Sequence, residues 1–201
     1  MYDIAAIVLA AGLSRRMGDV NKLLIEIDGT PMIRATVAAC CAVCDAPVTV
    51  VTGHQSGQIE RVLEGLDVRF IHNPDFASGQ QGSVAAGLRA APEAGTTLVV
   101  LGDQPLLDRS ALERLLAVHQ ASDQTRITLP VNGAERGNPL LIPLALKRSL
   151  MADRANPGCR KFTHDHPDKV NPVALRDPAY FTDLDTLEDL QSFRSGSARS
   201  R

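Results

Sequence analysis

The chain has 201 residues, of which 44% are hydrophobic and 22% charged, a composition that is ordinary for one globular domain with a sizeable core. Its formal net charge of −2 argues against a protein that binds nucleic acid through a broad basic face. It contains no Trp and only 3% aromatic residues, so we expect no nucleic-acid partner of the kind that stacks single-stranded bases.

The N-terminal apolar segment, residues 4–13, is too short to span a bilayer. Asp3 precedes it and Arg15 and Arg16 follow it, so the basic stretch that opens a secretory signal peptide is missing. We therefore expect a cytoplasmic protein that has no membrane partner.

Short apolar runs rich in β-branched residues alternate with helical patterns along the first part of the chain. The runs that predict buried strands are residues 3–10, 47–52, 68–72, 96–102 and 126–130. The segments between them that predict helices begin at residue 31 or cover residues 57–65, 82–91 and 109–120. This alternation is typical of βαβ units and a mostly parallel sheet, in which ligands bind at the carboxyl ends of the strands.

Residues that favour helix N-termini precede three of these helices. Thr30, followed by Pro31 at the first helical position, is expected to cap the first. Ser56 and Asp108 are expected to cap the second and the fourth. In the helix after Asp108 the apolar spacing predicts one buried face, formed by Leu112, Leu115, Leu116 and His119.

Beyond Pro130 the alternation becomes irregular. We expect a loop leading into a strand over residues 135–143 and a second strand over 169–177. Helical patterns cover residues 144–151 and 158–166.

The last helix is expected to follow Thr186 as its cap, with Asp189 at the capping-box position. Its expected apolar face consists of Leu187, Leu190 and Phe193. We expect one domain over residues 1–194 and a disordered polar tail over residues 195–201.

Four cysteines occur, and three of them form the stretch CCAVC at Cys40, Cys41 and Cys44. A zinc site needs about four ligands, and no second C-x-x-C supports this one. We expect small buried residues of an apolar helix here rather than a metal or redox site.

The first expected strand ends in the stretch AAGLSRRMG, residues 10–18. Gly12 and Gly18 would let backbone N–H groups approach phosphate oxygens, and Arg16 can bind such oxygens in a fork. Lys22 adds a second cation a few residues on. The stretch is neither a Walker A loop nor a dinucleotide fingerprint. It predicts a phosphate-binding loop, and the alternative is a turn with exposed arginines.

Two acidic positions are candidates for a metal site. Asp103, in GDQP, directly follows an apolar strand, and a carboxylate at that edge is a natural Mg²⁺ ligand. Asp183 and Asp185 share a face if their segment is extended. The alternatives are a strand-ending turn for Asp103 and acids at a helix start for the pair.

The glycine-bearing loop at residues 78–83 precedes the third helix and could present backbone and amide groups to a heterocycle. The alternative is a plain loop with a helix cap. Further along, two short basic segments offer groups for an acidic substrate, with solvated surface as the alternative: Arg136, Asn138, Arg160 and Lys161.

The histidines of the HDH stretch, His164 and His166, would diverge on a helix, so we do not expect them to share a metal.

Taken together, the motifs LAAGLSRRMG, NKLL, GDQP, RGNP and DLDTLEDL occur in an order that resembles one family. From about Ile4 to Phe193 the chain resembles the nucleotidyltransferases related to molybdenum cofactor cytidylyltransferase. The resemblance implies a Rossmann-like α/β domain of three layers with a mostly parallel mixed sheet. It implies transfer of CMP from CTP to the phosphate of Mo-molybdopterin, giving molybdopterin cytosine dinucleotide and pyrophosphate. The partner it implies is a molybdenum hydroxylase or its maturation factor.

The resemblance also implies roles for matching positions. Arg16, Lys22 and Asp103 would be catalytic, and Asp103 and Asp185 would hold Mg²⁺, with Mn²⁺ as the alternative. Lys22 would touch the α-phosphate, and the 78–83 loop would meet the base. The positions implied to bind the nucleotide are Leu9, Ala10, Ala11, Gly12, Ser14, Arg15, Gly18, Lys22, Ser78, Gly79, Ser83 and Asp103.

Ala11 bears on the choice of base. Cytidylyl-type relatives read L-A-A-G here, as this chain does, whereas guanylyl-type relatives read L-A-G-G. The Cβ of Ala11 would narrow the slot and favour a pyrimidine, and one methyl group is worth ~1–3 kcal/mol of discrimination.

Two segments depart from the family's pattern. Relatives commonly read R-G-H-P where this chain has Asn138, and G-A-R where it has Cys159 between Gly158 and Arg160. Both lie on the expected acceptor side, so the nucleotide half of the assignment is firmer.

Alternative functions remain open. The acceptor could be a sugar-1-phosphate, a methylerythritol phosphate or another phosphorylated small molecule. The chain could instead be a chaperone that binds a nucleotide or cofactor without turnover, although Lys22, Asp103 and Asp185 argue against lost catalysis. A dinucleotide-dependent oxidoreductase is excluded by the missing G-x-G-x-x-G.

Overall fold

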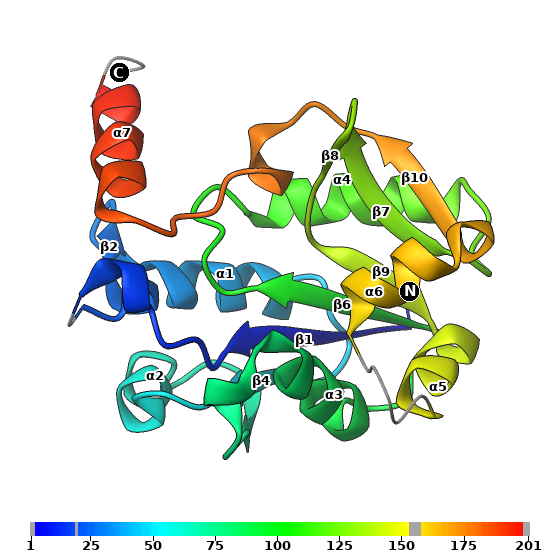
Figure 1. The fold of residues 1–201 in the computed structure, drawn as a ribbon, viewed down its shortest axis with the longest axis horizontal. Coiled ribbons are helices and arrows are strands. Elements are labelled where there is room, and N and C mark those ends of the chain that lie inside the picture. The colour runs from blue at the N-terminus through cyan, green and yellow to red at the C-terminus, as the bar shows by residue number, and fades with distance from the viewer. Residues whose placement is uncertain (1–2, 19, 153–157, 199–201) are drawn as a thin grey trace.

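A computed structural model describes residues 3–18, 20–152 and 158–198, which form a mixed α/β structure (Figure 1). The strands of its large sheet are β1 (Ile4–Ala10), β4 (Val48–Thr52), β5 (Val68–His72), β6 (Thr96–Leu101), β7 (Ile127–Asn132), β8 (Glu135–Arg136), β9 (Leu140–Pro143) and β10 (Val170–Ala174). Two further strands, β2 (Glu26–Ile27) and β3 (Thr30–Pro31), pair with each other. The α-helices are α1 (Met32–Cys41), α2 (Ser56–Val62), α3 (Gln80–Ala90), α4 (Arg109–Gln120), α5 (Leu144–Ala152), α6 (Cys159–Asp165) and α7 (Leu187–Ala198). The short 3₁₀ helices are η1 (Arg15–Met17), η2 (Lys22–Leu24), η3 (Phe76–Ser78), η4 (Pro167–Lys169) and η5 (Pro178–Tyr180).

The large sheet has the order β10-β7-β9-β6-β1-β4-β5, with β8 paired to β7. β1 pairs in parallel with β4 on one side and β6 on the other, so Val8 lies opposite both Val50 and Val100. β9 runs antiparallel between β6 and β7. The predicted α/β fold with a mostly parallel mixed sheet is therefore confirmed. From β1 the strand order runs through β4 to β5 on one side, and it continues with β6 on the other side of β1. Sheets of this kind form their ligand site at such a switch, here between β1 and β6.

Helices cover both faces of the sheet and complete three layers (Figure 1). Side chains of β1 alternate between two apolar cores, Val8 facing the core with α1, α2 and α4, and Ile7 facing the core with α3, α5 and α6. All residues of β1 are buried, which is why this strand reads as a continuous apolar run. The edge strand β5 is half-exposed, so its prediction as a buried strand is wrong on burial.

Two of the expected caps form and two do not. Asp108 accepts a hydrogen bond from the Ala111 N–H at 2.7 Å and opens α4 as predicted. Thr186 and Asp189 form a reciprocal capping box, with N–H to side-chain oxygen distances of 2.8 and 3.1 Å. Thr30 instead belongs to strand β3.

Ser56 is the first residue of α2 rather than its cap, which is Gln55 in a left-handed conformation with a φ of 53°. The prediction of a cap at Ser56 is therefore wrong.

The last helix differs from its prediction in two ways. α7 runs to Ala198, past the expected domain boundary at 194, so residues 195–198 are helical where a disordered tail was expected. Residues 199–201 lie outside the described part of the chain. Leu190 is buried as expected, whereas Leu187 is 48% exposed and does not join the apolar face. Figure 1 shows α7 standing away from the sheet.

The four cysteines are free thiols. Cys40 is buried in α1 as expected. Cys41 and Cys44 are only partly buried, and Cys44 lies just past the end of that helix, so the expectation of buried helical residues is wrong for these two. Burial raises the pKa of the Cys44 thiol to about 12, which disfavours the thiolate that redox or metal chemistry requires.

Within the described residues every helix is too short or too polar to cross a membrane.

Candidate active site

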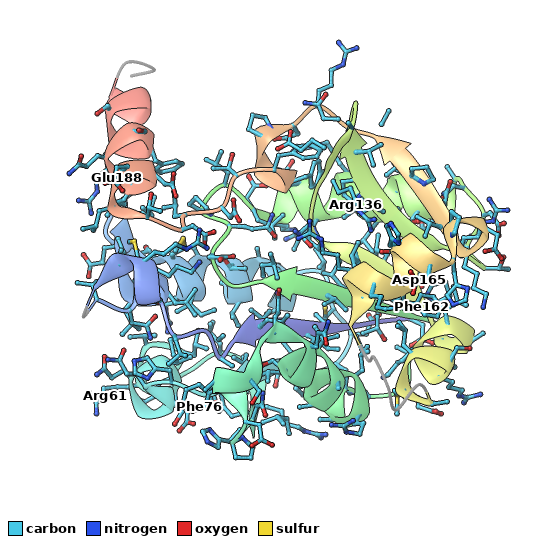
Figure 2. All side chains as sticks on the ribbon, viewed as in Figure 1. Arg61, Phe76, Arg136, Phe162, Asp165 and Glu188 are labelled. Carbon is cyan, nitrogen blue, oxygen red and sulfur yellow. The ribbon has the colours of Figure 1, made fainter. Side chains whose placement is uncertain are left out.

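A pocket of about 940 Å³ opens where the chain reverses across the sheet, at the carboxyl ends of β1 and β6. It is lined by the loop after β1, the loop after β6, the start of α3 and the segments around Arg136, Arg160 and Asp183. Figure 2 shows the two sides of this region: Phe76 lies on the side of α2 and α3, and Arg136 lies across β6 toward β7 and β8. A cavity of this size holds a ligand as large as a nucleotide.

The loop after β1 is fixed by its own hydrogen bonds. Ser14 adopts a left-handed conformation with a φ of 49°, and its carbonyl accepts from the Met17 N–H at 2.8 Å. The Ser14 hydroxyl oxygen accepts from the backbone N–H of Lys22 at 3.2 Å, which ties this loop to η2. Met17 is only 2% exposed and anchors the loop in the core.

Lys22 is directed toward the pocket by its neighbours in η2. Asn21 accepts a hydrogen bond from the Leu23 N–H at 3.1 Å and so starts this short helix, and Leu23 is buried in the core. Lys22 therefore sits on a rigid turn at the pocket wall.

The loop after β6 carries Asp103 very close to β1. A Cβ at Gly102 would come within 2.9 Å of the Leu9 carbonyl oxygen and 2.7 Å of Ile33, so the position requires glycine. The Gly102 N–H extends the sheet by donating to that carbonyl at 3.1 Å. The glycine of GDQP is what lets the next residue, Asp103, lie beside the loop that follows β1.

A network of ion pairs joins the two loops to the segment before α7. Lys22 Nζ lies 2.5 Å from Oδ2 of Asp103 and 2.6 Å from Oδ1 of Asp185. Arg16 Nη2 lies 2.6 Å from the other oxygen of Asp185. The side chains of Lys22 and Asp103 are 13% and 15% exposed, so this pair is shielded from solvent, unlike the 67% exposed Arg16.

The pKa values in this cluster follow from burial and from these partners. Burial would lower the pKa of Lys22, but Asp103 and Asp185 outweigh it and leave that pKa raised. Burial would raise the pKa of Asp185, but Lys22 and Arg16 outweigh it and leave that pKa lowered. For Asp183, burial together with the charges of Asp103 and Asp185 raises the pKa.

Three carboxylates form a group that could hold a divalent cation. Asp103, Asp183 and Asp185 each offer an oxygen, and these oxygens lie within 4.8 Å of one another. Oδ1 of Asp103 is buried and accepts no hydrogen bond from any residue that the structure describes, whereas buried carboxylate oxygens ordinarily have such a partner. Hard oxygen donors of this kind are the ligands that Mg²⁺ and Mn²⁺ take, and the donor set therefore fits such an ion.

The side of the pocket near α3 is closely packed. A Cβ built on Gly53 would lie 3.0 Å from the Cβ of Ala11 and 2.5 Å from that of Phe76, so Ala11, Gly53 and Phe76, which follow β1, β4 and β5, are in close contact. Ala11, Phe76 and Ser83 line the pocket. Ser83 accepts a hydrogen bond from the side-chain amide of the buried Asn73 at 3.0 Å.

The opposite side of the pocket is basic. Arg136, Asn138 and Arg160 line it, and within the described part of the chain neither arginine forms an ion pair with an acidic side chain. Arg136 donates a hydrogen bond to the Thr163 hydroxyl. Partial burial together with repulsion from Arg160 lowers the pKa of Arg136, as expected for two cations that face one cavity. Lys161 points elsewhere and pairs with Asp165.

Most of the residues expected at the site do line the pocket: Leu9, Ala11, Gly12, Ser14, Arg16, Lys22, Gly79, Ser83, Asp103 and Asp185. Ala10, Gly18 and Ser78 do not. Ala10 follows the alternation of β1 into the opposite core, and Ser78 is exposed beside the pocket residues Ala77 and Gly79. The side chain of Arg15 lies outside the part of the chain that the structure describes.

Sequence reasoning missed Phe76 and Asn73. Phe76 was visible only as an isolated aromatic residue. Asn73 begins the N-P-D stretch, a turn signal whose asparagine also reaches Ser83.

The histidines of HDH diverge as expected. His164 contacts Asp165, whereas the His166 ring packs 4.8 Å from that of Phe162. In the described residues neither belongs to a group of three possible metal ligands.

Residues 6–170 match the family of the MobA-like NTP transferase domain. Among curated proteins, the bifunctional protein GlmU of Lactobacillus delbrueckii subsp. bulgaricus is 30% identical over 151 residues, which are 75% of this chain and 31% of that protein. The chain thus spans less than a third of the length of this curated relative.

Solved structures extend the similarity to nearly the whole chain. A nucleotidyl transferase from Methanothermobacter thermautotroptrophicus superposes with a TM-score of 0.80 at 27% identity, covering 98% of this chain and 99% of its own. Rv0371c from Mycobacterium tuberculosis H37Rv superposes with a TM-score of 0.76 at 25% identity, covering 95% and 97%. Rv0371c has also been solved in complex with manganese.

Proposed function

The chain belongs to the MobA-like NTP transferase domain family, and from this membership we propose that it is a nucleotidyltransferase that transfers CMP from CTP to the phosphate of Mo-molybdopterin. The products are molybdopterin cytosine dinucleotide and pyrophosphate. One observation carries the nucleotidyl-transfer part of the proposal: Lys22, Arg16, Asp103 and Asp185 meet in one ion-pair network at the mouth of a nucleotide-sized pocket. Phosphoryl chemistry depends mainly on such positioned charges.

The acceptor is itself a nucleophile. A phosphate oxygen of Mo-molybdopterin forms a bond to the α-phosphorus of CTP, and the bond from that phosphorus to the oxygen bridging the β-phosphate breaks. The electron pair leaves with pyrophosphate, so no serine or cysteine nucleophile is required. The acceptor phosphate is an anion near neutral pH and needs no strong general base.

The protein's task is to bring two polyanions together and to neutralise the charge that develops. Arg16 in η1 and Lys22 in η2 reach the pocket on the side where a nucleotide's phosphates would lie. Their charges would compensate the phosphates and the leaving pyrophosphate. Asp103, Asp185 and Asp183 would hold Mg²⁺ or Mn²⁺, which when bound supplies Lewis-acid stabilisation of phosphate charge.

The preference for CTP is supported by the close packing near α3. Ala11 and Phe76 line the pocket and pack around Gly53, so the methyl group of Ala11 would take room from a purine base placed against them. The anionic acceptor is supported by the opposite side, where Arg136 and Arg160 face the cavity and pair with no acidic side chain of the described residues.

Pyrophosphate release tests the proposal. The protein is mixed with Mg²⁺ or Mn²⁺, one of four nucleoside triphosphates, and one of three acceptors: Mo-molybdopterin, a sugar-1-phosphate or methylerythritol phosphate. Manganese is included because Rv0371c has been solved with it. We expect pyrophosphate and a cytosine dinucleotide, identified by mass, only with CTP and Mo-molybdopterin.

The other outcomes are equally informative. Release with a different acceptor would replace Mo-molybdopterin in the proposal. Tight CTP binding without release with any acceptor would favour the chaperone alternative.

A further inference from the structure

Ser83 is a buried hydroxyl on the wall of the pocket, near the start of α3. It is 4% exposed and is held by a residue that does not itself line the pocket, Asn73, which is 6% exposed. The side-chain amide nitrogen of Asn73 lies 3.0 Å from the Ser83 oxygen.

The orientation of the Asn73 amide is fixed by a backbone group. The N–H of Asp75 points at the side-chain oxygen of Asn73 at 3.1 Å, and a backbone N–H can only donate. The atom facing Asp75 is therefore the amide oxygen, and the atom facing Ser83 is the NH₂ group. An amide NH₂ can only donate, so the Ser83 oxygen must accept.

A serine hydroxyl that accepts on one side keeps its own hydrogen for another partner. Within the described residues Ser83 makes no second side-chain hydrogen bond. The chain of donors thus runs from Asp75 through Asn73 to Ser83 and leaves an O–H beside the cavity.

We propose that Asn73 is a positioning residue that fixes Ser83 as a hydrogen-bond donor toward the nucleotide base. The Ser83 hydroxyl then donates a hydrogen bond to a base atom that carries a lone pair and no hydrogen, such as N3 or O2 of cytosine. The inference rests on the proposed function, because it takes the side of the pocket near α3 as the base site.

The variant Asn73→Asp reverses the direction of this chain at nearly constant shape. Its carboxylate still accepts from the Asp75 N–H, but it presents an acceptor to Ser83 instead of a donor. The Ser83 hydrogen then turns away from the base, and a lone pair faces the base atom in its place. We expect the Kd for CTP, measured by calorimetry with Mg²⁺, to rise about tenfold or more.

Inorganic tripolyphosphate is the control ligand, because it has the phosphates of CTP and no base. An effect of the added negative charge alone would weaken both ligands alike. We expect Asn73→Asp to leave the tripolyphosphate Kd within about twofold of the wild-type value. Equal losses for CTP and tripolyphosphate, or no loss for either, would overturn the inference.

The variant Ser83→Ala completes a double-mutant cycle. Alone it should weaken the binding of CTP and leave the binding of tripolyphosphate unchanged. In its background Asn73→Asp should cause no further loss of CTP affinity, because the hydroxyl that Asn73 orients is already absent. A full additional loss would show that Asn73 acts by another route. If Asn73→Asp does not fold, Ser83→Ala alone decides: unchanged CTP affinity then refutes the role of the hydroxyl.

The wild-type protein separates this inference from the proposed function. If it binds CTP no more tightly than tripolyphosphate, the pocket is not a nucleotide site and both fall. If it binds CTP more tightly and the variants do not discriminate, only the inference falls.

Discussion

Lys22 Nζ lies 2.5 Å from Oδ2 of Asp103, although 81 residues separate the two in the sequence. The contact joins the loop after β1 to the loop after β6, and Asp185 closes the group from the segment before α7. A cation from the chain thus sits among the carboxylates that would hold a divalent metal. Catalysis, metal binding and nucleotide binding are expected to respond together when this contact is changed.

Asp103→Ala is expected to fold and to lose turnover by on the order of 10²-fold or more, because it removes a charge that organises the phosphates in the transition state. Thermal unfolding should show a folded protein, and pyrophosphate release with CTP and Mg²⁺ should show the loss. Arg109→Ala is a suitable control, because Arg109 lies on the exposed start of α4 and, among the residues that the structure describes, forms an ion pair with Glu113 alone. Normal turnover by Asp103→Ala would disprove its assigned role.

Lys22→Met is expected to have two opposite effects. Turnover with CTP should fall, since a phosphate-neutralising charge is lost. In the absence of nucleotide, the affinity for Mn²⁺ should rise, because Asp103 and Asp185 lose their buried counter-ion and repel each other until a cation binds. Electron paramagnetic resonance of free Mn²⁺ measures this directly. Lys22→Arg keeps the charge and serves as the control; equal Mn²⁺ affinity in Lys22→Met and wild type would contradict the explanation.

Arg160→Met is expected to raise the KM for the phosphorylated acceptor about tenfold and to leave the KM for CTP within about twofold. The reason is that a charge-assisted hydrogen bond to an anion is worth roughly 1.5–3 kcal/mol. The neighbouring Lys161→Met is a matched control, because Lys161 pairs with Asp165 outside the pocket. A shift in the KM for CTP alone would show that Arg160 contacts the nucleotide and not the acceptor.

Ala11→Gly is expected to shift the preference toward purine nucleotides. The change removes the methyl group that packs beside Gly53 and Phe76, and it should raise the ratio of GTP to CTP use by about tenfold, in line with ~1–3 kcal/mol per methyl group. Competition between the two nucleotides in one assay gives this ratio. An unchanged ratio would mean that the base lies elsewhere.

We expect the stability of the folded protein to depend on pH through His119. It is buried in α4, with hydrogen bonds to Thr96 at 3.2 Å and Thr128 at 2.7 Å, and burial lowers its pKa below the ordinary value of 6.5. Below pH 6.5 the unfolded chain binds a proton that the folded protein does not, so the free energy of unfolding falls as the pH drops through this region. At higher pH this contribution is constant.

Urea unfolding at pH 8.0 and pH 5.5 tests this dependence. His119→Gln cannot titrate in this range and should lose less stability on acidification than the wild-type protein. Equal losses in both proteins would assign the acid sensitivity to other groups.

Much of the fold was predictable because each signal was local. The apolar runs identified β1, β4 and β6, and short-range caps at Asp108 and Thr186 formed as expected. Thr30 failed as a cap because its backbone pairs with Ile27 in the small hairpin, a contact that propensity does not contain. The antiparallel β9 was visible as a strand, but its place between β6 and β7 depends on long-range pairing.

The candidate site shows the same division. Asp103 and the loop after β1 were identified because residues at strand ends converge at one edge of a parallel sheet. Ala10 was included with its neighbours, yet the alternation of β1 turns it into the opposite core. Asn73 was overlooked because it does not line the pocket and contacts it only through Ser83, and a contact between two buried side chains leaves no pattern in one sequence.

The sheet order has a consequence for how such a protein can diversify. The wall near Ala11 and Phe76 is built from the β1, β4 and β5 half, whereas Arg136 and Arg160 come from β8 and α6, on the half that contains β7 and β10. The two halves meet at β1 and β6, where the charged cluster lies. If the chain acts as proposed, insertions or replacements in the later half would change the acceptor and leave the choice of nucleotide unaltered. Specificity for the two substrates would then be encoded by separate segments of one gene.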